Sequence, residues 1–206
     1  MEKAMPTDPM TIRDEVAALK RARIVEVAAD LFYKNGYDNT TLEAVGESLG
    51  VTKPFIYAHF KSKTELLAKI CSRAIESSSE VIDQVIGLDV SATEKLERLA
   101  RGFVKAVLVN QKFIAVFARE EKALAKEDLD EINKKRRKFD TQLTALLSEG
   151  KALGEFGIGD EHVAALSIGG MVSWAYVWFR EGGRMSVEEV SQEMSTLILN
   201  LVSARR

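Results

Sequence analysis

The sequence has 206 residues, of which 46% are hydrophobic and 29% are charged, and its formal net charge at pH 7 is -2. This composition is typical of a globular protein and excludes a disordered or collagen-like chain. The nearly balanced charge provides no overall electrostatic attraction to nucleic acid, so any DNA binding must depend on a local group of basic residues.

The sequence also bears on the cellular compartment and on metal binding. Cys71 is the one cysteine, which excludes an intramolecular disulfide, and no cluster of Cys or His residues has zinc-ligand spacing. The first residues contain no apolar stretch resembling a signal peptide. We therefore expect a cytoplasmic protein that uses no metal and no cofactor.

Helical patterns begin at residue 11. The spacing of apolar residues predicts a helix over 11–35 that ends at Gly36. Further helix starts are predicted where a Ser or Thr precedes a Glu by three residues, because the two side chains can bond each other's free backbone amides. These pairs are Thr40 with Glu43, Ser62 with Glu65, Ser91 with Glu94, and Ser186 with Glu189. Together the patterns predict an all-α chain of about nine helices.

Residues 40–63 have the pattern of a helix-turn-helix. A short helix is followed by Gly50, which suits a left-handed turn, and by Thr52, which is expected to cap a second helix. Pro54 fits the first turn of that second helix, where its missing N–H costs little. Gly46 is small enough to let the two helices cross closely.

Basic residues gather around the second helix of this pattern. Residues 51–63 contain no acidic residue, and their basic members are Lys53, His59, Lys61 and Lys63. Such a local basic group is what DNA binding requires of a chain that is not basic overall. Short helical hairpins joined by glycine are also common in proteins that do not bind DNA, so the pattern by itself leaves both interpretations open.

The same region resembles the tetracycline-repressor (TetR) family. The residues that carry the resemblance are Gly50-Val51-Thr52, the run Ile56-Tyr57-Ala58-His59-Phe60-Lys61-Ser62-Lys63, and, in phase before them, Phe32, Gly36, Tyr37, Thr40 and Thr41. Pro54 stands where the family usually has glycine. The resemblance implies an N-terminal three-helix helix-turn-helix domain over residues 1–62 and a C-terminal helical ligand-binding and dimerisation domain over residues 63–206.

The resemblance also implies which side chains meet DNA. They are Thr41, Thr52, Lys53, Phe55, Tyr57, His59 and Lys63. Thr41 and Lys63 begin helices and would bind phosphates together with the free amides there, and Tyr57 and His59 are placed for backbone oxygens as well. The other three would meet base edges, Lys53 through guanine acceptors. Phe55 would contact a thymine methyl, whereas Phe60 is expected in the core.

The C-terminal third is predicted to form a homodimer interface. The uncharged stretch 163–179 is near the lower length limit of a membrane span. Its two glycines and a serine, with charged residues close on both sides, favour instead a helix buried on nearly all sides. The expected interface residues are the small ridge Ala165, Gly169 and Ser173, and the coiled-coil-like series Val190, Met194, Leu197 and Leu201. Two such helices from each subunit would form a four-helix bundle.

The middle of the chain is expected to hold a ligand pocket. Pockets combine apolar walls with a few polar groups. The candidate residues are Phe103, Val107, Phe113 and Phe117, with Glu120 or Arg119 as a polar contact, and Trp174 and Trp178, which face either the pocket or the dimer seam. Helical aromatics at this spacing are more often part of an ordinary core.

A basic run at residues 134–138 favours a solvated helix face, because Asp130 and Glu131 precede Lys134 and Lys135 by four positions. An acyl-CoA effector, which some members of the family use, would place its phosphates at this run.

These observations predict a ligand-responsive transcriptional regulator. We expect a repressor that a small apolar effector, with an acyl-CoA-like molecule as one candidate, releases from a palindromic operator. The expected partners are double-stranded operator DNA, the effector and a second copy of the chain, and no membrane. The alternative is a helical small-molecule-binding protein or enzyme without a DNA role. Against an enzyme, the sequence contains no nucleophile-base pairing, metal set or glycine-rich phosphate loop.

Overall fold

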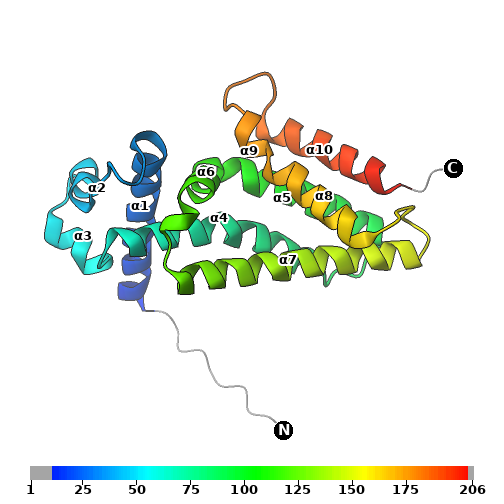
Figure 1. The fold of residues 1–206 in the computed structure, drawn as a ribbon, viewed down its shortest axis with the longest axis horizontal. Helices are drawn as coiled ribbons and strands as arrows, with labels where there is room; N and C mark the ends of the chain where they lie inside the picture. Colours follow the sequence, from blue (N-terminus) through cyan, green and yellow to red (C-terminus); the bar gives the residue numbers. More distant parts are fainter. Residues whose placement is uncertain (1–10, 204–206) are drawn as a thin grey trace, which may run out of the picture. The chain divides into compact units, whose positions relative to one another are not determined.

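A computed structural model describes residues 11–203, and this part of the chain is helical almost throughout (Figure 1). It contains ten labelled α-helices and one 3₁₀ turn, against the nine or so expected, and the shortest α-helix is a single turn. The one pairing of extended backbone within residues 11–203 is an isolated bridge between Phe156 and Ser203. The prediction of an all-α protein is therefore confirmed.

The chain divides into two compact units whose boundary lies between Leu66 and Leu67, inside a helix. The N-terminal unit holds α1 (Ile12–Asn35), α2 (Leu42–Leu49), α3 (Lys53–His59) and the first turn of α4 (Lys63–Val85). Its core consists of Ile24, Ala28, Phe32, Val45, Ile56 and Phe60, which are essentially inaccessible to solvent. The apolar spacing along α1 thus becomes one buried face, as predicted.

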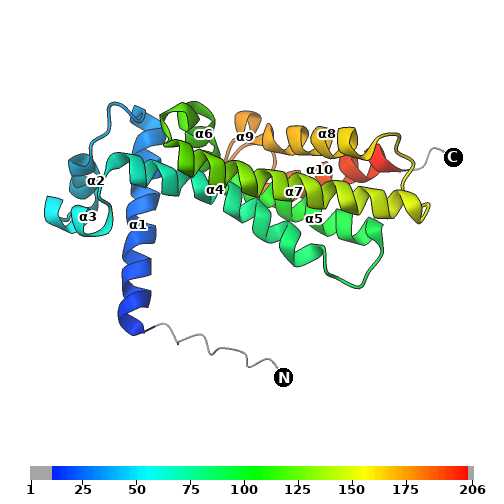
Figure 2. The same ribbon diagram turned by 60° about the horizontal axis from the view of Figure 1, so that its bottom comes forward.

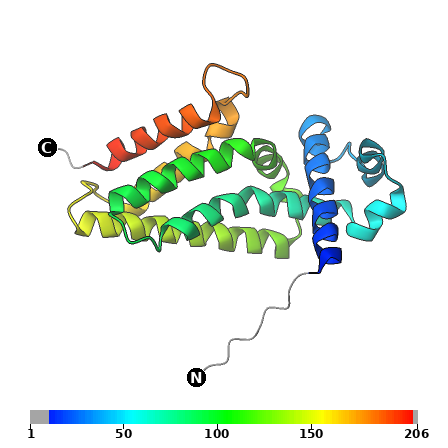
Figure 3. The same cartoon turned by 180° about the vertical axis from the view of Figure 1, so that it is seen from behind.

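The C-terminal unit contains the rest of α4, six further α-helices and the 3₁₀ turn η1. In chain order these are α5 (Ala92–Val109), α6 (Gln111–Glu120), η1 (Glu121–Ala123), α7 (Lys126–Ala152), α8 (Glu161–Ser173), α9 (Ala175–Trp178) and α10 (Val187–Val202). Within this unit α10 packs along α5 and α8 packs along α7 (Figures 2 and 3). A continuous apolar core joins α5, α7, α8 and α10.

Side chains cap the helix starts close to the predicted positions. At α10, Ser186 and Glu189 form the complete reciprocal arrangement. The pairing of Thr40 with Glu43 is wrong by one residue: Thr41 caps α2 by accepting a hydrogen bond from the Ala44 amide at 3.1 Å. Thr40 is buried and donates to the Gly36 carbonyl oxygen at 2.9 Å instead.

The uncharged stretch after residue 161 differs from the expected all-round burial. Helix α8 ends at Ser173, and α9 starts two residues later. One face of this stretch is open to solvent, with Val163 60%, Leu166 51%, Trp174 62% and Trp178 49% exposed. The prediction of a helix buried on nearly all sides is therefore wrong for the single subunit. No helix within residues 11–203 is long and apolar enough to cross a lipid bilayer.

Candidate functional site

The turn between α2 and α3 depends on two glycines. Gly50 ends α2 with φ +67°, a left-handed conformation that glycine adopts without strain. At Gly46 an added Cβ would lie 3.2 Å from the Val51 carbonyl oxygen and 3.3 Å from the Ile56 side chain. The predicted roles of both glycines in the turn and in the close helix crossing are confirmed.

Helix α3 presents one face to solvent and buries the other. Lys53, Pro54, Tyr57 and Ala58 are exposed, whereas Ile56 and Phe60 are buried. Phe55 and His59 are half-buried, and their rings lie edge to face with centroids 5.1 Å apart. The side chains predicted to meet DNA therefore surround the exposed face of a short, rigidly anchored helix.

Thr52 occupies the N-cap position of α3, but its side chain makes no capping hydrogen bond. The expectation that its hydroxyl caps the helix is therefore wrong. Thr52 is exposed. Its hydroxyl is consequently free of a cap and open to another partner.

Lys53 is paired within the N-terminal unit. Its ammonium group forms an ion pair with the carboxylate of Glu43 on α2, and both side chains remain substantially exposed. The hydrogen bond from Lys53 lowers the pKa of Glu43, and the same carboxylate raises the pKa of Lys53. Nζ of Lys53 also lies 5.5 Å from the ring centroid of Tyr57. A DNA base or phosphate would have to compete with Glu43 for this ammonium group.

Lys63, predicted to bind a phosphate, makes contacts within the N-terminal unit. Its Nζ donates to the Tyr37 carbonyl oxygen at 2.9 Å and lies 4.2 Å from the centroid of the Tyr37 ring. This contact ties the start of α4 to the loop after α1. Thr41, whose side chain caps the start of α2, is exposed.

Two basic residues of α1 belong to this surface and were not among the predicted contacts. Arg21 donates to the His59 carbonyl oxygen, forms a 3.4 Å ion pair with Glu65, and stacks 4.2 Å from the Phe60 ring centroid. Lys20 is exposed, and its Nζ lies 5.8 Å from the ring centroid of Phe55. The basic residues at positions 20, 21 and 23 were the available sequence signal.

The C-terminal unit contains a cavity of about 280 Å³ between α4, α5, α6, α7 and α8. Phe103 and Val107 line it, as predicted, together with Phe139 and Ile114. Its polar lining comes from Ser78, Ser79, Arg136, Asp140 and Ser173. Gly169 and Gly170 complete the wall on α8, so part of the small-residue ridge predicted for the dimer interface also lines this cavity.

Other predicted pocket residues lie elsewhere. Phe113 and Phe117 are buried, and neither they nor Glu120 belongs to the cavity wall. Trp174 and Trp178 are outside the wall as well, and about half or more of each remains exposed. Three consecutive serines in α4, Ser77 to Ser79, were the overlooked signal, because serine is unfavourable inside a helix.

Two lysines of the basic run on α7 form ion pairs with α4. Lys135 contacts Glu76 at 2.7 Å, and Lys138 contacts Asp83 at 2.8 Å. Lys134 is 3.9 Å from Glu131 on its own helix, and Arg136 lines the cavity. The ion pairs of Lys135 and Lys138 hold α7 against α4. This part of α7 is therefore not the purely solvated helix face that the sequence pattern favoured.

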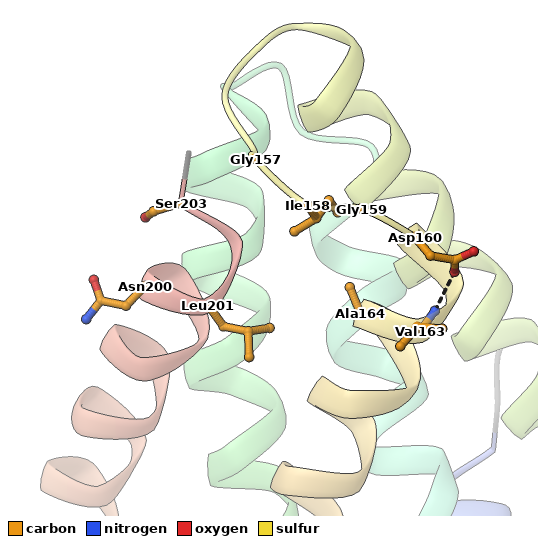
Figure 4. Close-up of a pocket in the computed structure, with 9 residues that line it drawn as sticks. All are labelled: Gly157, Ile158, Gly159, Asp160, Val163, Ala164, Asn200, Leu201 and Ser203. Atoms are coloured by element: carbon orange, nitrogen blue, oxygen red, sulfur yellow. Dashed lines mark hydrogen bonds between the residues drawn. The ribbon is translucent and has the colours of Figure 1, made fainter. Parts of the chain in front are cut away.

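The outer surface of the C-terminal unit carries a groove of about 570 Å³ that is lined by both apolar and polar residues. Figure 4 shows Leu201 of α10 and Ala164 of α8 on opposite sides of it, with residues 157–159 across its end. Leu197 and Leu201 are 56% and 50% exposed. Among the predicted interface residues, those that face the subunit's own core are Ala165, Val190 and Met194.

Two features bear on chemistry. The Cys71 thiol is fully buried, and this burial, reinforced by nearby acidic residues, raises its pKa to about 12. It is therefore neither nucleophilic nor accessible near neutral pH. Residues 11–203 contain no group of three or more His, Cys, Asp or Glu side chains arranged to hold a metal ion.

Comparisons with known proteins agree with this architecture. Residues 24–70 match the bacterial regulatory proteins of the tetR family, and residues 89–202 match the tetracyclin repressor-like C-terminal domain. The HTH-type transcriptional repressor KstR2 of Mycolicibacterium smegmatis is 25% identical over 201 residues, covering 94% of this chain and 92% of that protein.

Solved structures of similar fold cover nearly the whole chain. The TetR family regulator PfmR of Thermus thermophilus has a TM-score of 0.80 and 29% identity, covering 89% of this chain and 100% of that one. AibR, solved with isovaleryl coenzyme A and operator DNA, has a TM-score of 0.75 and 24% identity, covering 91% of this chain and 100% of that one. With its exposed α3 and its separate helical unit, the chain belongs to the TetR family of bacterial transcriptional regulators.

Proposed function

We propose that this regulator is a repressor that binds a palindromic operator and leaves it when a small apolar effector occupies the cavity in the C-terminal unit. The observation that carries the proposal is the exposed face of α3, where Thr52, Lys53 and Tyr57 are accessible on a helix anchored by buried Ile56. An α-helix with this exposure fits the major groove of B-DNA. The relative KstR2 is described as a transcriptional repressor, which supports repression over activation for this chain.

The proposed DNA contacts follow from placement on this surface. Thr52, Lys53 and Phe55 at the start of α3 are assigned to base edges, and Tyr57 and His59 to phosphates. Thr41 and Lys63, at the starts of α2 and α4, are assigned to phosphates on either side. A helix N-terminus with free amides favours such anions.

We further propose that two copies associate through α8 and α10. Val163, Leu166, Leu197 and Leu201 leave their apolar side chains at least half exposed on these helices. A second copy is the occupant that the proposed function itself requires, since one recognition helix reaches only a few base pairs and tight binding needs two half-sites. The result would be a four-helix bundle made from two helices of each subunit.

Helix α4 belongs to both units, since the boundary after Leu66 falls inside it. Its residues Ser78 and Ser79 line the cavity, and its first residue, Lys63, bonds the loop after α1. An effector that binds more tightly when α4 is displaced weakens DNA binding. DNA weakens effector binding by the same coupling free energy, which is typically about 1–3 kcal/mol. An acyl-CoA-like effector is one candidate, supported by the ligand in the AibR structure.

The DNA role is tested by fluorescence anisotropy with the upstream region of the chain's own gene and a scrambled duplex. Because Lys53 is assigned to guanine acceptors, Lys53→Ala should weaken binding to the upstream duplex by about tenfold or more. The substitution should weaken binding to the scrambled duplex less, so the ratio of the two affinities should fall. The control is Lys134→Ala, which removes an exposed positive charge from α7 and should leave both affinities unchanged.

Failure of the wild-type protein to prefer any upstream duplex over scrambled DNA would favour the alternative of a ligand-binding protein without a DNA role. Equal losses in the two variants would show that Lys53 acts through net charge and reads no base.

A further inference from the structure

Helix α3 is too short to hold its own position. It has seven residues, and an isolated helix of this length is unstable in water because its first turn is costly to form. The Thr52 side chain does not cap its N-terminus, and Ile56 is the one buried residue among the seven. Contacts made by neighbouring helices must therefore fix the orientation in which α3 meets DNA.

Arg21 of α1 holds the C-terminal end of α3. One guanidinium nitrogen donates to the carbonyl oxygen of His59, the last residue of the helix, and such a terminal carbonyl has no partner within its own helix. A cation at this end also interacts favourably with the helix dipole. The guanidinium carbon lies over the ring of Phe60, 4.2 Å from its centroid, and Phe60 is fully buried.

The same guanidinium reaches the start of α4. Its other terminal nitrogen lies 3.4 Å from Oε1 of Glu65, and Oε2 of Glu65 accepts a hydrogen bond of 2.7 Å from the backbone amide of Lys61. Arg21 thus joins α1 to the end of α3, to the following turn and to the first turn of α4. These contacts need a planar group with two donor nitrogens and a stacking face, which the single ammonium group of a lysine does not provide.

We propose that Arg21 is a positioning residue for operator recognition. Its guanidinium sets the orientation of α3 relative to α1 and so aligns the exposed side chains of α3 with base edges, without itself reading a base. This inference rests on the proposed function, because it concerns the same DNA surface. The Arg21 side chain is 42% exposed, so a direct contact with a DNA phosphate is the alternative that the experiment has to separate.

Arg21→Lys separates the two roles, because lysine keeps the positive charge and lacks the planar fork. Anisotropy titrations of the full chain use the upstream and the scrambled duplex, each at a series of salt concentrations. Affinity for the upstream duplex should fall by about tenfold, since a well-aligned base contact contributes roughly 5- to 150-fold in discrimination. Affinity for the scrambled duplex and both salt slopes should stay unchanged, because the charge is kept. Arg23→Lys, at an exposed position of the same helix, is the matched control and should change neither affinity.

Amide hydrogen exchange in the absence of DNA tests the contact with α3 itself. In Arg21→Lys the amides of residues 57–60 should exchange about fivefold faster, which is the size of one lost hydrogen bond, and the amides of α2 should be unaffected. A general loss of stability would instead accelerate exchange in both helices alike and leave the ratio of the two DNA affinities unchanged. That result would contradict the proposal.

The inference would also be overturned if Arg21→Lys kept the wild-type preference for the upstream duplex, or if it lost affinity equally for both duplexes. In the first case, an Arg21→Gln variant whose salt slope falls by about one on both duplexes would identify Arg21 as a phosphate contact. These outcomes leave the wild-type preference for the upstream duplex intact and refute only the role of Arg21. A wild-type protein without that preference would refute the proposed function as well.

Discussion

Lys53 shows how a single residue on the exposed face of α3 is controlled by its neighbours. Its ammonium group is held by Glu43 in the free protein, and both groups keep contact with water. A carboxylate at this position also faces the phosphates that the surface is proposed to approach. Glu43 should therefore reduce the affinity for every duplex. The reduction should be smaller for duplexes in which a base offers Lys53 a better partner than Glu43.

Replacing Glu43 with Gln should raise the affinity for scrambled DNA by up to about fivefold, the size of an exposed ion pair, and raise operator affinity less. Anisotropy titrations with both duplexes measure this difference. Glu47→Gln removes the same charge from an exposed position on α2 and serves as the control. If both variants changed binding equally, the pairing with Lys53 would have no effect on discrimination.

At the scale of elements, ion pairs hold α4 against α7. Glu76 accepts hydrogen bonds from Lys135 and from Ser72, both at 2.8 Å or less. Burial opposes ionisation of this carboxyl, but the bonds from Lys135 and Ser72 and the nearby lysines outweigh it and lower the pKa of Glu76. The ionised form of Glu76 therefore stabilises the C-terminal unit.

The pH dependence follows from the sign of this shift. Because the pKa of Glu76 is lower in the folded state than its usual 4.5, its contribution is complete above that value and disappears as the pH falls through the folded pKa. We expect Glu76→Gln to lower the free energy of unfolding by up to about 1 kcal/mol at pH 7.

Chemical denaturation at a series of pH values measures this effect, and the difference between wild type and Glu76→Gln should vanish below the folded pKa. Glu80→Gln, at an exposed position of α4, should have little effect at any pH. A deficit that persisted unchanged in acid would show that the loss comes from packing and that the ion pair contributes nothing.

At the scale of the whole molecule, the proposed repressor depends on a second copy. Leu197 and Leu201 lie one turn apart on α10 and remain half exposed. Leu197→Glu should therefore convert the dimer to a monomer by burying a charge in the seam, which light scattering after size exclusion detects.

The same variant should bind the full operator at least about 100-fold more weakly, because two linked half-sites gain that much from effective concentration. Val109→Glu places an equal charge on another exposed apolar residue, on α5, and should leave both mass and affinity unchanged. A dimeric Leu197→Glu protein would exclude this face of α10 as the interface.

The sequence by itself determined the helical class and the helix-turn-helix. Those features depend on short-range patterns: the apolar spacing along α1, the left-handed turn at Gly50 and the close crossing at Gly46 involve residues near one another in the chain. Local backbone preferences decide such features before distant segments meet. Even there, the cap of α2 was displaced by one residue, because adjacent Thr40 and Thr41 offer the same hydroxyl.

Only the tertiary structure decided which helix faces meet. Periodicity defines an apolar stripe on each helix, but it does not say which other helix covers that stripe. Gly169 and Ser173, for example, line the cavity, whereas Phe113 is buried outside the cavity wall. Ser79 on α4 and Arg136 on α7 both line this cavity, although no local pattern connects the two positions. Packing of several distant helices determines such surroundings, because the burial of each apolar face depends on all the others.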